Sequence, residues 1–502
     1  MSTYLVTVVG QTATGLRTYR WSTGTGYVDG DRNVYDPAVI DPGSFVRALI
    51  RQGATYGQSQ VGYGTVVINN ADGELDDLID VAFDGRRILI ADTTGRVYLD
   101  GTVGGVEFRR REIVFRIRDR QALVGDLLIE TATFAGTNVL PDGFEGTAND
   151  IGGVVEPRAW GVLRGIALPM VNTSRNIFQI STGPIASVNQ VQDGGAAITA
   201  GSVYATLADV QSVAPAGATY RPFLGSATEA SYLRTGSDPV RILTADVTEG
   251  AVAADRTVAQ IMRRILRRVG LTALDIEGDA AVDSIAPWTG GFFCPAGEPT
   301  TVKVALDALA ASIHGFWIGT RTGKVRIGIL RPPAGIPVLT LTQDDIAENG
   351  TSLDRIVTEG EGLPVWRVTV RYQRNWTPQS RDQLAGVAKA EQERLGQAAR
   401  SIVREDATIK ARHPLATELV VETVLDTLAD ATALRDAVWS CYSVQRDVFA
   451  VGVAPDLAAD LELNDVVSLN VPRFGLASGR LFRVIGIDQQ IRRGTAILTL
   501  WG

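Results

Sequence analysis

Short runs in which hydrophobic and polar residues alternate recur from one end of the chain to the other, and turn residues bound most of them. In residues 112–118, Ile113, Phe115 and Ile117 fall on one side, opposite three charged residues. Such alternation is typical of a β-strand with one buried face. Similar runs predict strands at residues 4–9, 65–69, 87–91 and 97–103. We therefore expect a small antiparallel barrel or sandwich over residues 1–129.

Residues 461–502 contain three runs rich in β-branched or aromatic residues, at 466–471, 481–487 and 495–501. Pro472, Gly475, Gly479 and Gly494 lie in the connections, which are short. Connections of this length join antiparallel neighbours. The segment therefore predicts a three-stranded antiparallel meander.

Helical spacing dominates residues 249–335. Val258, Ile261, Met262 and Ile265 recur three or four positions apart and Gly270 follows, which predicts a helix, and a second helix is expected at 302–313. Two runs at 316–320 and 325–329 predict a hairpin. We expect an α/β domain here.

The remaining residues complete a β-rich α+β fold. Turn residues are dense in 130–248, which predicts an irregular β domain. Residues 336–502 contain a strand at 367–372, a polar helix-prone segment at 381–400, a helix with an apolar stripe at 427–446 and the terminal meander. The expected domains are therefore 1–129, 130–248, 249–335 and 336–502. The first and last are small antiparallel barrels or sandwiches, and the irregular β and α/β domains are inserted between them.

Composition narrows the functional classes. The chain has 502 residues, 53 glycines and a formal net charge of −8. A protein that holds nucleic acid through its phosphates is normally basic, so this balance argues against stable nucleic-acid binding. The sequence contains no apolar run of membrane-spanning length and no secretory signal pattern, so we expect a protein without a membrane span.

Residues that could carry catalysis are scarce. The only histidines are His314, expected at a helix end in a core or capping role, and His413, expected at a helix end or loop. Cys294 and Cys441 lie far apart and fit no metal or redox spacing, so we interpret them as buried thiols. We predict no catalytic, cofactor-binding or metal-binding residues, and no cofactor.

Three local patterns have both a functional and a structural interpretation. Asp72, Glu74, Asp76, Asp77 and Asp80 could supply oxygens to a cation, but their spacing misses the EF-hand loop and a solvated turn is favoured. Gly319–Lys324 is one residue short of a phosphate-binding loop and lies in the expected hairpin. Arg263, Arg264, Arg267 and Arg268 share a helix face that could meet DNA or an acidic partner, or simply face solvent.

The terminal meander resembles the C-terminal segment of tail-tip, or baseplate hub, proteins of long-tailed bacteriophages and gene transfer agents. Asn464 stands where that family usually has Gly, and Asn tolerates the left-handed backbone region that a tight turn needs. Upstream segments in all four expected domains, including 69–78, 134–161 and 374–379, also resemble the family. The matched positions are Leu463, Asp465, Val467, Arg473, Gly475, Leu476, Gly479, Phe482, Val484, Ile487, Leu498, Trp501 and Gly502.

The resemblance implies a structural virion protein at the tail tip, made in the bacterial host cytoplasm. It implies a homotrimer in which each chain contributes two tube-like β domains, so that six continue the tail tube around the DNA exit channel. The implied partners are the distal tail protein above and a central fibre or tail-tip protein below, with DNA passing through without specific binding. Carboxylates near Asp72–Asp80 or Asp460–Asp465 are expected on the channel wall, and the Arg263–Arg268 face toward protein partners.

A β-rich virion-associated glycan hydrolase or a receptor-binding protein remains the alternative. Paired carboxylates occur throughout an acidic chain, so glycosidase chemistry stays open. The sequence singles out no particular pair.

Overall fold

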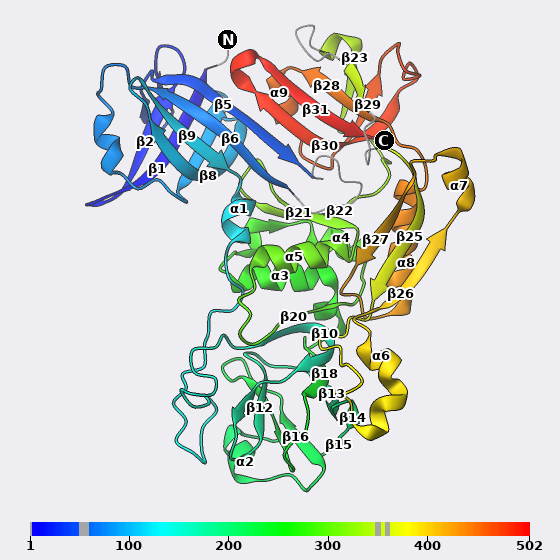
Figure 1. Ribbon diagram of the computed structural model, residues 1–502. Coiled ribbons are helices and arrows are strands. Elements are labelled where there is room, and N and C mark those ends of the chain that lie inside the picture. Colours follow the sequence, from blue (N-terminus) through cyan, green and yellow to red (C-terminus); the bar gives the residue numbers. More distant parts are fainter. Residues whose placement is uncertain (1–2, 50–59, 347–352, 357–361) are drawn as a thin grey trace.

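The computed structural model describes residues 3–49, 60–346, 353–356 and 362–502. The fold is β-rich and of the α+β type, as the sequence patterns predict. Within these residues the largest sheet has 13 strands and combines segments from both ends of the chain. Figure 1 shows the first and last β regions together at the top of the view, with the intervening residues extending below them.

The first β region contributes strands in the order β2-β1-β7-β8-β9-β6-β5. Neighbours are antiparallel, and Val6, Ile88, Phe115 and Trp21 lie in a shared core beneath the sheet. The five predicted strands are confirmed, whereas β2 and β5 were not predicted. The bounds are β1 Tyr4–Thr12, β2 Gly15–Ser22, β5 Val39–Ala48, β6 Gln60–Asn69, β7 Arg87–Asp92, β8 Val97–Phe108 and β9 Glu112–Arg118, with the small pair β3 Tyr27–Val28 and β4 Val34–Tyr35.

The last β region contains the predicted meander. β29, β30 and β31 follow one another as antiparallel neighbours, β28 pairs with the other side of β31, and β23 runs parallel to β29. Asn464 has a φ of 75°, so the residue that replaces the family's usual Gly adopts the expected left-handed conformation. The bounds are β23 Leu339–Thr342, β24 Leu353–Ile356, β28 Val448–Val453, β29 Val466–Asn470, β30 Arg480–Gln490 and β31 Thr495–Trp501.

Strands β5 and β30 join the two β regions edge to edge. Ser44 to Ala48 pair antiparallel with Gly486 to Gln490. This pairing joins strands from the two ends of the chain into one hydrogen-bonded sheet. Leu49 extends the contact by donating its N–H to the carbonyl of Ile485 at 2.8 Å. The described path through the sheet runs from β2 to β24 and stays open.

Two five-stranded sheets fill most of residues 158–294 and lie at the bottom of Figure 1. Their orders are β14-β13-β18-β10-β20 and β11-β12-β17-β16-β15. Leu163, Ile180, Leu233 and Val247 belong to one core between them. The bounds are β10 Arg158–Ala167, β11 Met170–Asn172, β12 Ile177–Ser181, β13 Ser187–Asp193, β14 Ala196–Ala197, β15 Thr199–Ala200, β16 Thr219–Phe223, β17 Ser231–Thr235, β18 Leu243–Thr248 and β20 Gly291–Cys294.

The predicted helices and hairpin of residues 249–335 lie between the β regions at the top of Figure 1 and the two five-stranded sheets at the bottom. The helices α3 and α5 each begin after a threonine, Thr257 and Thr301, whose side chain accepts an N–H of the first turn. The hairpin of β21 and β22 is confirmed as an antiparallel pair. The bounds are α1 Arg120–Gly125, α2 Leu207–Ser212, α3 Val258–Arg268, α4 Asp279–Ile285, α5 Val302–Ala311, β19 Ile276–Glu277, β21 Gly315–Gly319 and β22 Val325–Ile329.

The segment predicted to be helix-prone, residues 381–400, is only partly helical. It forms one 3₁₀ segment, η5 (Gly386–Glu391), and the short helix α6 (Gln392–Gly396), and Arg400 already begins a strand. Leu384, Ala388 and Leu395 form a small apolar cluster that packs against Gly195, where a Cβ would meet Leu395 at 2.5 Å. Docking onto this glycine turn therefore fixes the segment more than helix propensity does.

The other elements of residues 336–502 surround helix α8, which confirms the predicted helix at 427–446 in shorter form. The three-stranded sheet β26-β25-β27 packs beside it. The bounds are β25 Val365–Tyr372, β26 Arg400–Glu405, β27 Thr417–Glu422, α6 Gln392–Gly396, α7 Ala407–Arg412, α8 Leu428–Tyr442 and α9 Pro455–Ala459, with 3₁₀ segments η1 Asp76–Asp80, η2 Ala253–Arg256, η3 Ala273–Asp275, η4 Gln343–Asp345, η5 Gly386–Glu391 and η6 Ile491–Arg493.

The main hydrophobic cluster includes residues from Val124 to Trp501. It contains the buried faces of α3, α5, α8 and β25, so one core spans several of the expected domains. The four-domain division therefore stays a prediction.

Replacing Trp501 by Ala should lower the free energy of unfolding by about 3–5 kcal/mol, because the side chain is buried and truncation leaves a cavity. Trp501 packs against Tyr442, with ring centroids 6.2 Å apart, and lies under the Arg446 guanidinium. Denaturant unfolding of the purified chain measures the effect. Ile336→Ala is the control, since Ile336 is 93% exposed. An equal, small effect of both substitutions would show that Trp501 does not support the core.

Candidate functional site: a buried polar junction

The predicted candidate cation cluster lies on an exposed turn. Asp72, Glu74, Asp76, Asp77 and Asp80 are all exposed, and Asp76 accepts a hydrogen bond from the side chain of Asn70 at 2.8 Å. Among the described residues, no three His, Cys, Asp or Glu side chains are grouped closely enough to hold a metal ion. The acidic residues therefore lie on an exposed turn, and the absence of a metal site there stays a prediction.

The histidines and cysteines are also placed as structural residues. His314 is buried, and its Nε2 lies 3.2 Å from the Tyr442 hydroxyl. Burial, helped by the Arg331 charge, lowers the pKa of His314 to about 3. Cys441 lies 3.9 Å from His314 Nδ1, whereas Cys294 lies in another part of the core. His413 ends helix α7, half-buried.

The arginine face of α3 is occupied largely by carboxylates of the same chain. Arg264 binds Glu249 through both guanidinium ends and also lies over the Trp160 ring. Arg268 binds Glu130 at 3.1 Å, and Arg263 binds Asp279 at 3.2 Å. These three arginines are therefore ion-paired within the chain, with Glu130 and Glu249 from loops and Asp279 from α4. That the Arg263–Arg268 face meets a protein partner stays a prediction. Arg267 is exposed.

The hairpin tip between β21 and β22 inserts between the two β regions. It contains the Gly319–Lys324 sequence that falls short of a phosphate loop, and its backbone is engaged by the surrounding chain. The carbonyl of Arg321 accepts the N–H of Asp100 at 2.7 Å, and its guanidinium donates to the carbonyl of Val97 at 2.6 Å. Arg120 donates to the carbonyl of Gly323 at 2.8 Å. The tip is therefore a structural element held between the two β regions.

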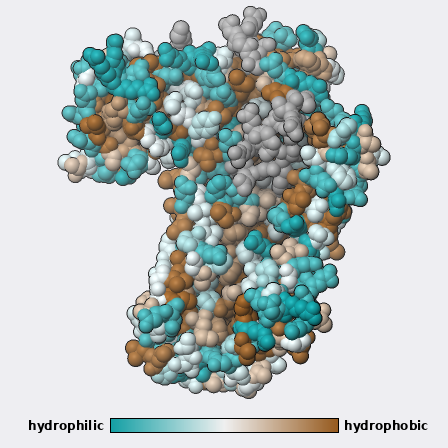
Figure 2. All heavy atoms as spheres, in the orientation of Figure 1, coloured by the Kyte–Doolittle hydropathy of each residue, from teal (hydrophilic) through white to brown (hydrophobic). Residues whose placement is uncertain are grey.

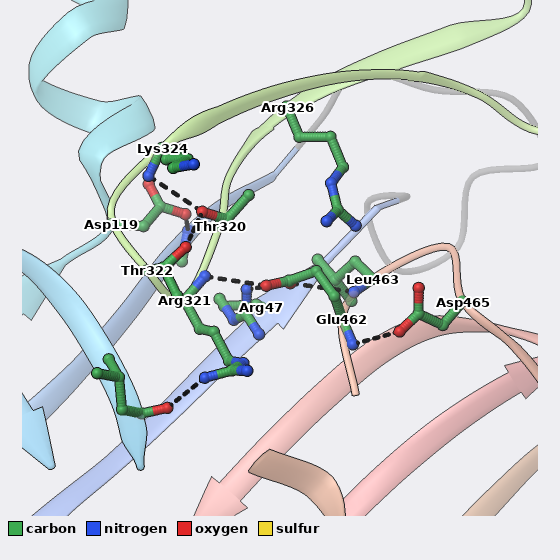
Figure 3. A network of polar contacts seen from close by, with 12 residues as sticks. Arg47, Asp119, Thr320, Arg321, Thr322, Lys324, Arg326, Glu462, Leu463 and Asp465 are labelled. Atoms are coloured by element: carbon green, nitrogen blue, oxygen red, sulfur yellow. Dashed lines mark hydrogen bonds and ion pairs between the residues drawn. The ribbon is translucent and has the colours of Figure 1, made fainter. Parts of the chain in front are cut away.

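Next to this hairpin tip lies a buried ion pair between Arg47 and Glu462. Arg47 comes from β5 and Glu462 from the loop after α9, 415 positions later, and they are 4% and 8% exposed. Glu462 also accepts the N–H of Arg321 at 3.0 Å and the N–H of Leu463 at 3.1 Å. Figure 3 shows the two side chains pointing toward each other beneath the hairpin. One carboxylate thus connects the first β region, the hairpin and the last β region.

The groups around Glu462 stabilise its charged form. Burial raises its pKa, but the Arg47 guanidinium and the N–H groups of Arg321 and Leu463 outweigh that effect, so the pKa lies below its usual value. Asp465 accepts the N–H of Glu462 at 2.8 Å and so fixes the turn that presents it. Glu462 is therefore engaged inside the subunit and is not exposed to a channel. Asp465 is half-buried, and its place on a channel wall stays a prediction.

Asp119 is the second buried carboxylate at the junction. It accepts the N–H of Gly62 at 2.6 Å and caps α1. A Cβ at residue 62 would meet Asp119 at 2.8 Å and Arg47 at 2.9 Å, so only glycine permits this approach. Burial raises the pKa of Asp119 to about 6, although Gly62 and Arg47 oppose the shift.

Sequence reasoning missed Arg47, Asp119 and Glu462, but a signal for Arg47 was present. In the alternating run Phe45, Arg47 and Leu49, the arginine occupies a position that faces the core. A charge at such a position needs a buried partner. The partner could not be found locally, because it lies near the other end of the chain.

No protein-family model matches the chain, and neither does any curated protein. Solved structures of similar fold include tail proteins and a chain of a gene transfer agent particle. A tail protein from Neisseria meningitidis is 11% identical, with a TM-score of 0.42, and the match covers 99% of this chain and 96% of that one. No helix within the described residues has the length and apolar character needed to cross a membrane.

Two further structures are similar. The 43 kDa tail protein of prophage MuSo2 from Shewanella oneidensis is 10% identical, with a TM-score of 0.43 and coverage of 100% of this chain and 96% of that one. A chain of the native gene transfer agent virion is 15% identical, with a TM-score of 0.41 and coverage of 70% and 84%.

Replacing Arg47 by Met should destabilise the junction by about 3–5 kcal/mol, because it leaves the Glu462 charge buried without a counterion. The double variant Arg47→Met with Glu462→Gln should recover part of this loss, since a neutral amide removes the charge and still accepts a backbone N–H. Denaturant unfolding of both single variants and the double variant completes the cycle. Arg110→Met, at an exposed arginine, is the control. Additive effects would contradict a coupled pair.

The raised pKa of Asp119 predicts a pH dependence. The folded chain holds this proton up to about pH 6, whereas the unfolded chain releases it near the ordinary value of 3.8. Its contribution to stability is therefore complete below about pH 4, decreases by about 3 kcal/mol as the pH rises to about 6, and stays constant above that. Thermal unfolding of wild type and Asp119→Asn between pH 4 and 7 should show this difference. Asp72→Asn, at an exposed turn, should have the same pH dependence of stability as wild type. Parallel stability profiles for wild type and Asp119→Asn would contradict the raised pKa of Asp119.

Proposed function

We propose that the chain is a structural virion protein of a phage-like tail, a tail-tip or baseplate hub subunit. In this role it continues the tail tube, joins the distal tail ring to a central fibre or tip protein, and surrounds the DNA exit channel. The observation that carries the proposal is the single sheet formed by the two ends of the chain. One subunit thereby presents two β regions on the same side, with the intervening residues extending away from them (Figure 1).

The family resemblance supports the same role at the level of residues. The positions that resemble tail-tip proteins fall on structural features: Leu463 is 1% exposed, Asp465 accepts the N–H of Glu462 across the turn that joins them, and Trp501 is buried in the main core. A trimer of such subunits has six β regions, which matches a sixfold tail tube. The proposed location is therefore the tail tip of a particle assembled in a bacterial host.

Subunit contacts in this ring need complementary surfaces. Figure 2 shows hydrophobic residues scattered among hydrophilic ones on the face in view. The outer strands of the described sheet are β2, β24 and β23, and strand edges recruit neighbours through unpaired backbone groups. We therefore propose that pairing at strand edges contributes to the ring.

The proposed channel wall is neutral to acidic. DNA passes such a wall without being held, whereas a wall of free arginines would bind its phosphates through counterion release. The carboxylates between Asp72 and Asp80 are exposed and stay candidates for the wall, and Asp460 is ion-paired with Arg96 at 3.2 Å. A particle reconstruction that placed Arg263–Arg268 in the bore would contradict this arrangement.

The proposal predicts self-association. Each chain has a mass of 53.6 kDa, so a ring of three has a mass of about 161 kDa. Mass photometry of the purified chain, alone and with the distal tail ring protein of the same particle, should detect this species. A chain that stays monomeric under both conditions would contradict the proposal.

An edge variant sharpens the same experiment. Ser22 donates its N–H away from β1, to the carbonyl of Asp36, so alternation directs the N–H of Thr18 outward as well. Thr18→Pro removes that donor and leaves the β1–β2 ladder intact, because proline is tolerated at strand edges. It should shift the mass toward the monomer, whereas Thr18→Val should not. A full trimer of Thr18→Pro would exclude β2 from the interface.

A further inference from the structure

The connection between β29 and β30, residues 471–479, holds an aromatic side chain at the surface. Phe474 is 50% exposed, and its ring contacts that of the buried Phe449, with centroids 5.8 Å apart. Leu476 anchors the turn, because its side chain is buried and its N–H donates to the carbonyl of Arg473 at 3.0 Å. The exposed ring is therefore held in place by the core beneath it.

The backbone of Phe474 lies in a conformation that its side chain disfavours. Its φ is 55°, in the left-handed region, where a Cβ is crowded and bulky residues are rare. Glycine adopts this conformation more readily. A phenylalanine in this place is not explained by the local stability of the turn. A strained residue at the surface is a reason to look for a function of its side chain.

An arginine lies beside the exposed ring. Arg473 is exposed, and its guanidinium carbon is 5.5 Å from the centre of the Phe474 ring. The described residues supply no ion-pair partner for Arg473, and residues 471–479 contain no carboxylate. Aromatic residues and arginines are the side chains that most often anchor protein interfaces. This pair suits a partner that offers an aliphatic side chain next to carboxylates.

The first β region offers such a surface on the 3₁₀ segment η1. Ile79 is 66% exposed, and the exposed carboxylates of Asp77 and Asp80 lie on either side of it in the sequence. Neither carboxylate forms an ion pair within the part of the chain that the structure describes. Leu78 is buried in the core of the first β region and holds the segment in place. Its charge and its apolar group therefore complement those of Arg473 and Phe474.

We propose that η1 of one copy of the chain docks against Arg473 and Phe474 of a second copy. The first β region lies at the left and the last at the right of the upper part of Figure 1, so the two surfaces belong to different regions. A contact between different surfaces of identical chains is head-to-tail, and it closes into a ring when the rotation between copies allows it. The inference rests on the proposed function, in which copies form a ring. It uses Asp77 and Asp80 and leaves Asp72 and Glu74 as candidates for the channel wall.

Charge reversal tests the contact. Sedimentation velocity of the full chain is measured under the condition in which wild type forms the trimer. Arg473→Glu and Asp77→Arg should each weaken association at least tenfold, because like charges then face each other. The double variant Arg473→Glu with Asp77→Arg should regain association, since opposite charges meet again. Arg492→Glu, at another exposed arginine of the last β region, is the matched control and should associate like wild type.

Cysteine variants locate the contact directly. Ile79→Cys and Phe474→Cys are made in separate chains and mixed under a mild thiol oxidant. The native Cys294 and Cys441 are buried and do not compete. The mixture should give a covalent dimer that neither variant gives alone. Thermal midpoints close to that of wild type check that the variants fold.

The outcomes separate this contact from the proposed function. A trimer that withstands both charge reversals, or a mixture of folded cysteine variants that gives no covalent dimer, would overturn the contact and leave the proposed function standing. A wild-type chain that stays monomeric, alone and with the distal tail ring protein, would contradict both. Regained association in the double variant supports the pairing of Arg473 with η1.

Discussion

The edge-to-edge pairing of β5 with β30 is the constraint on which the rest of the arrangement depends. It turns two β regions from opposite ends of the chain into one sheet, and it fixes where the intervening residues must leave and return. The hairpin of β21 and β22 lies beneath the pairing and forms hydrogen bonds to both β regions. Each element near the junction therefore has its position set by a contact far away in sequence.

Arg47 and Glu462 add specificity to this pairing. Removing two charges from water is costly, so a buried ion pair contributes little net stability compared with apolar residues. Its effect is on alternatives: a shifted register would leave either charge buried without its partner. We interpret the pair as a device that selects one register of β5 against β30, a role that buried polar groups have in some other folds. The backbone donors on Glu462 bring the hairpin into the same selection.

Local patterns predicted much of the fold. Three features can each be recognised from residues that are close together in the sequence: the alternation in Glu112–Arg118, the helical spacing in α3 and α5, and the short connections of the meander. No local pattern predicts the β5–β30 pairing, because its partners are separated by most of the chain and no local rule selects one edge over another. The counterions of the arginine face of α3 could not be predicted for the same reason, since Glu130 and Glu249 lie elsewhere in the chain.

The most direct test is a reconstruction of the tail tip of the intact particle at side-chain resolution. The account predicts three copies of this chain around the channel, each with β5 still paired to β30, Arg47 against Glu462, and both β regions along the tube wall. A tail tip in which β5 and β30 are separated, or in which only one β region of each chain reaches the wall, would contradict it.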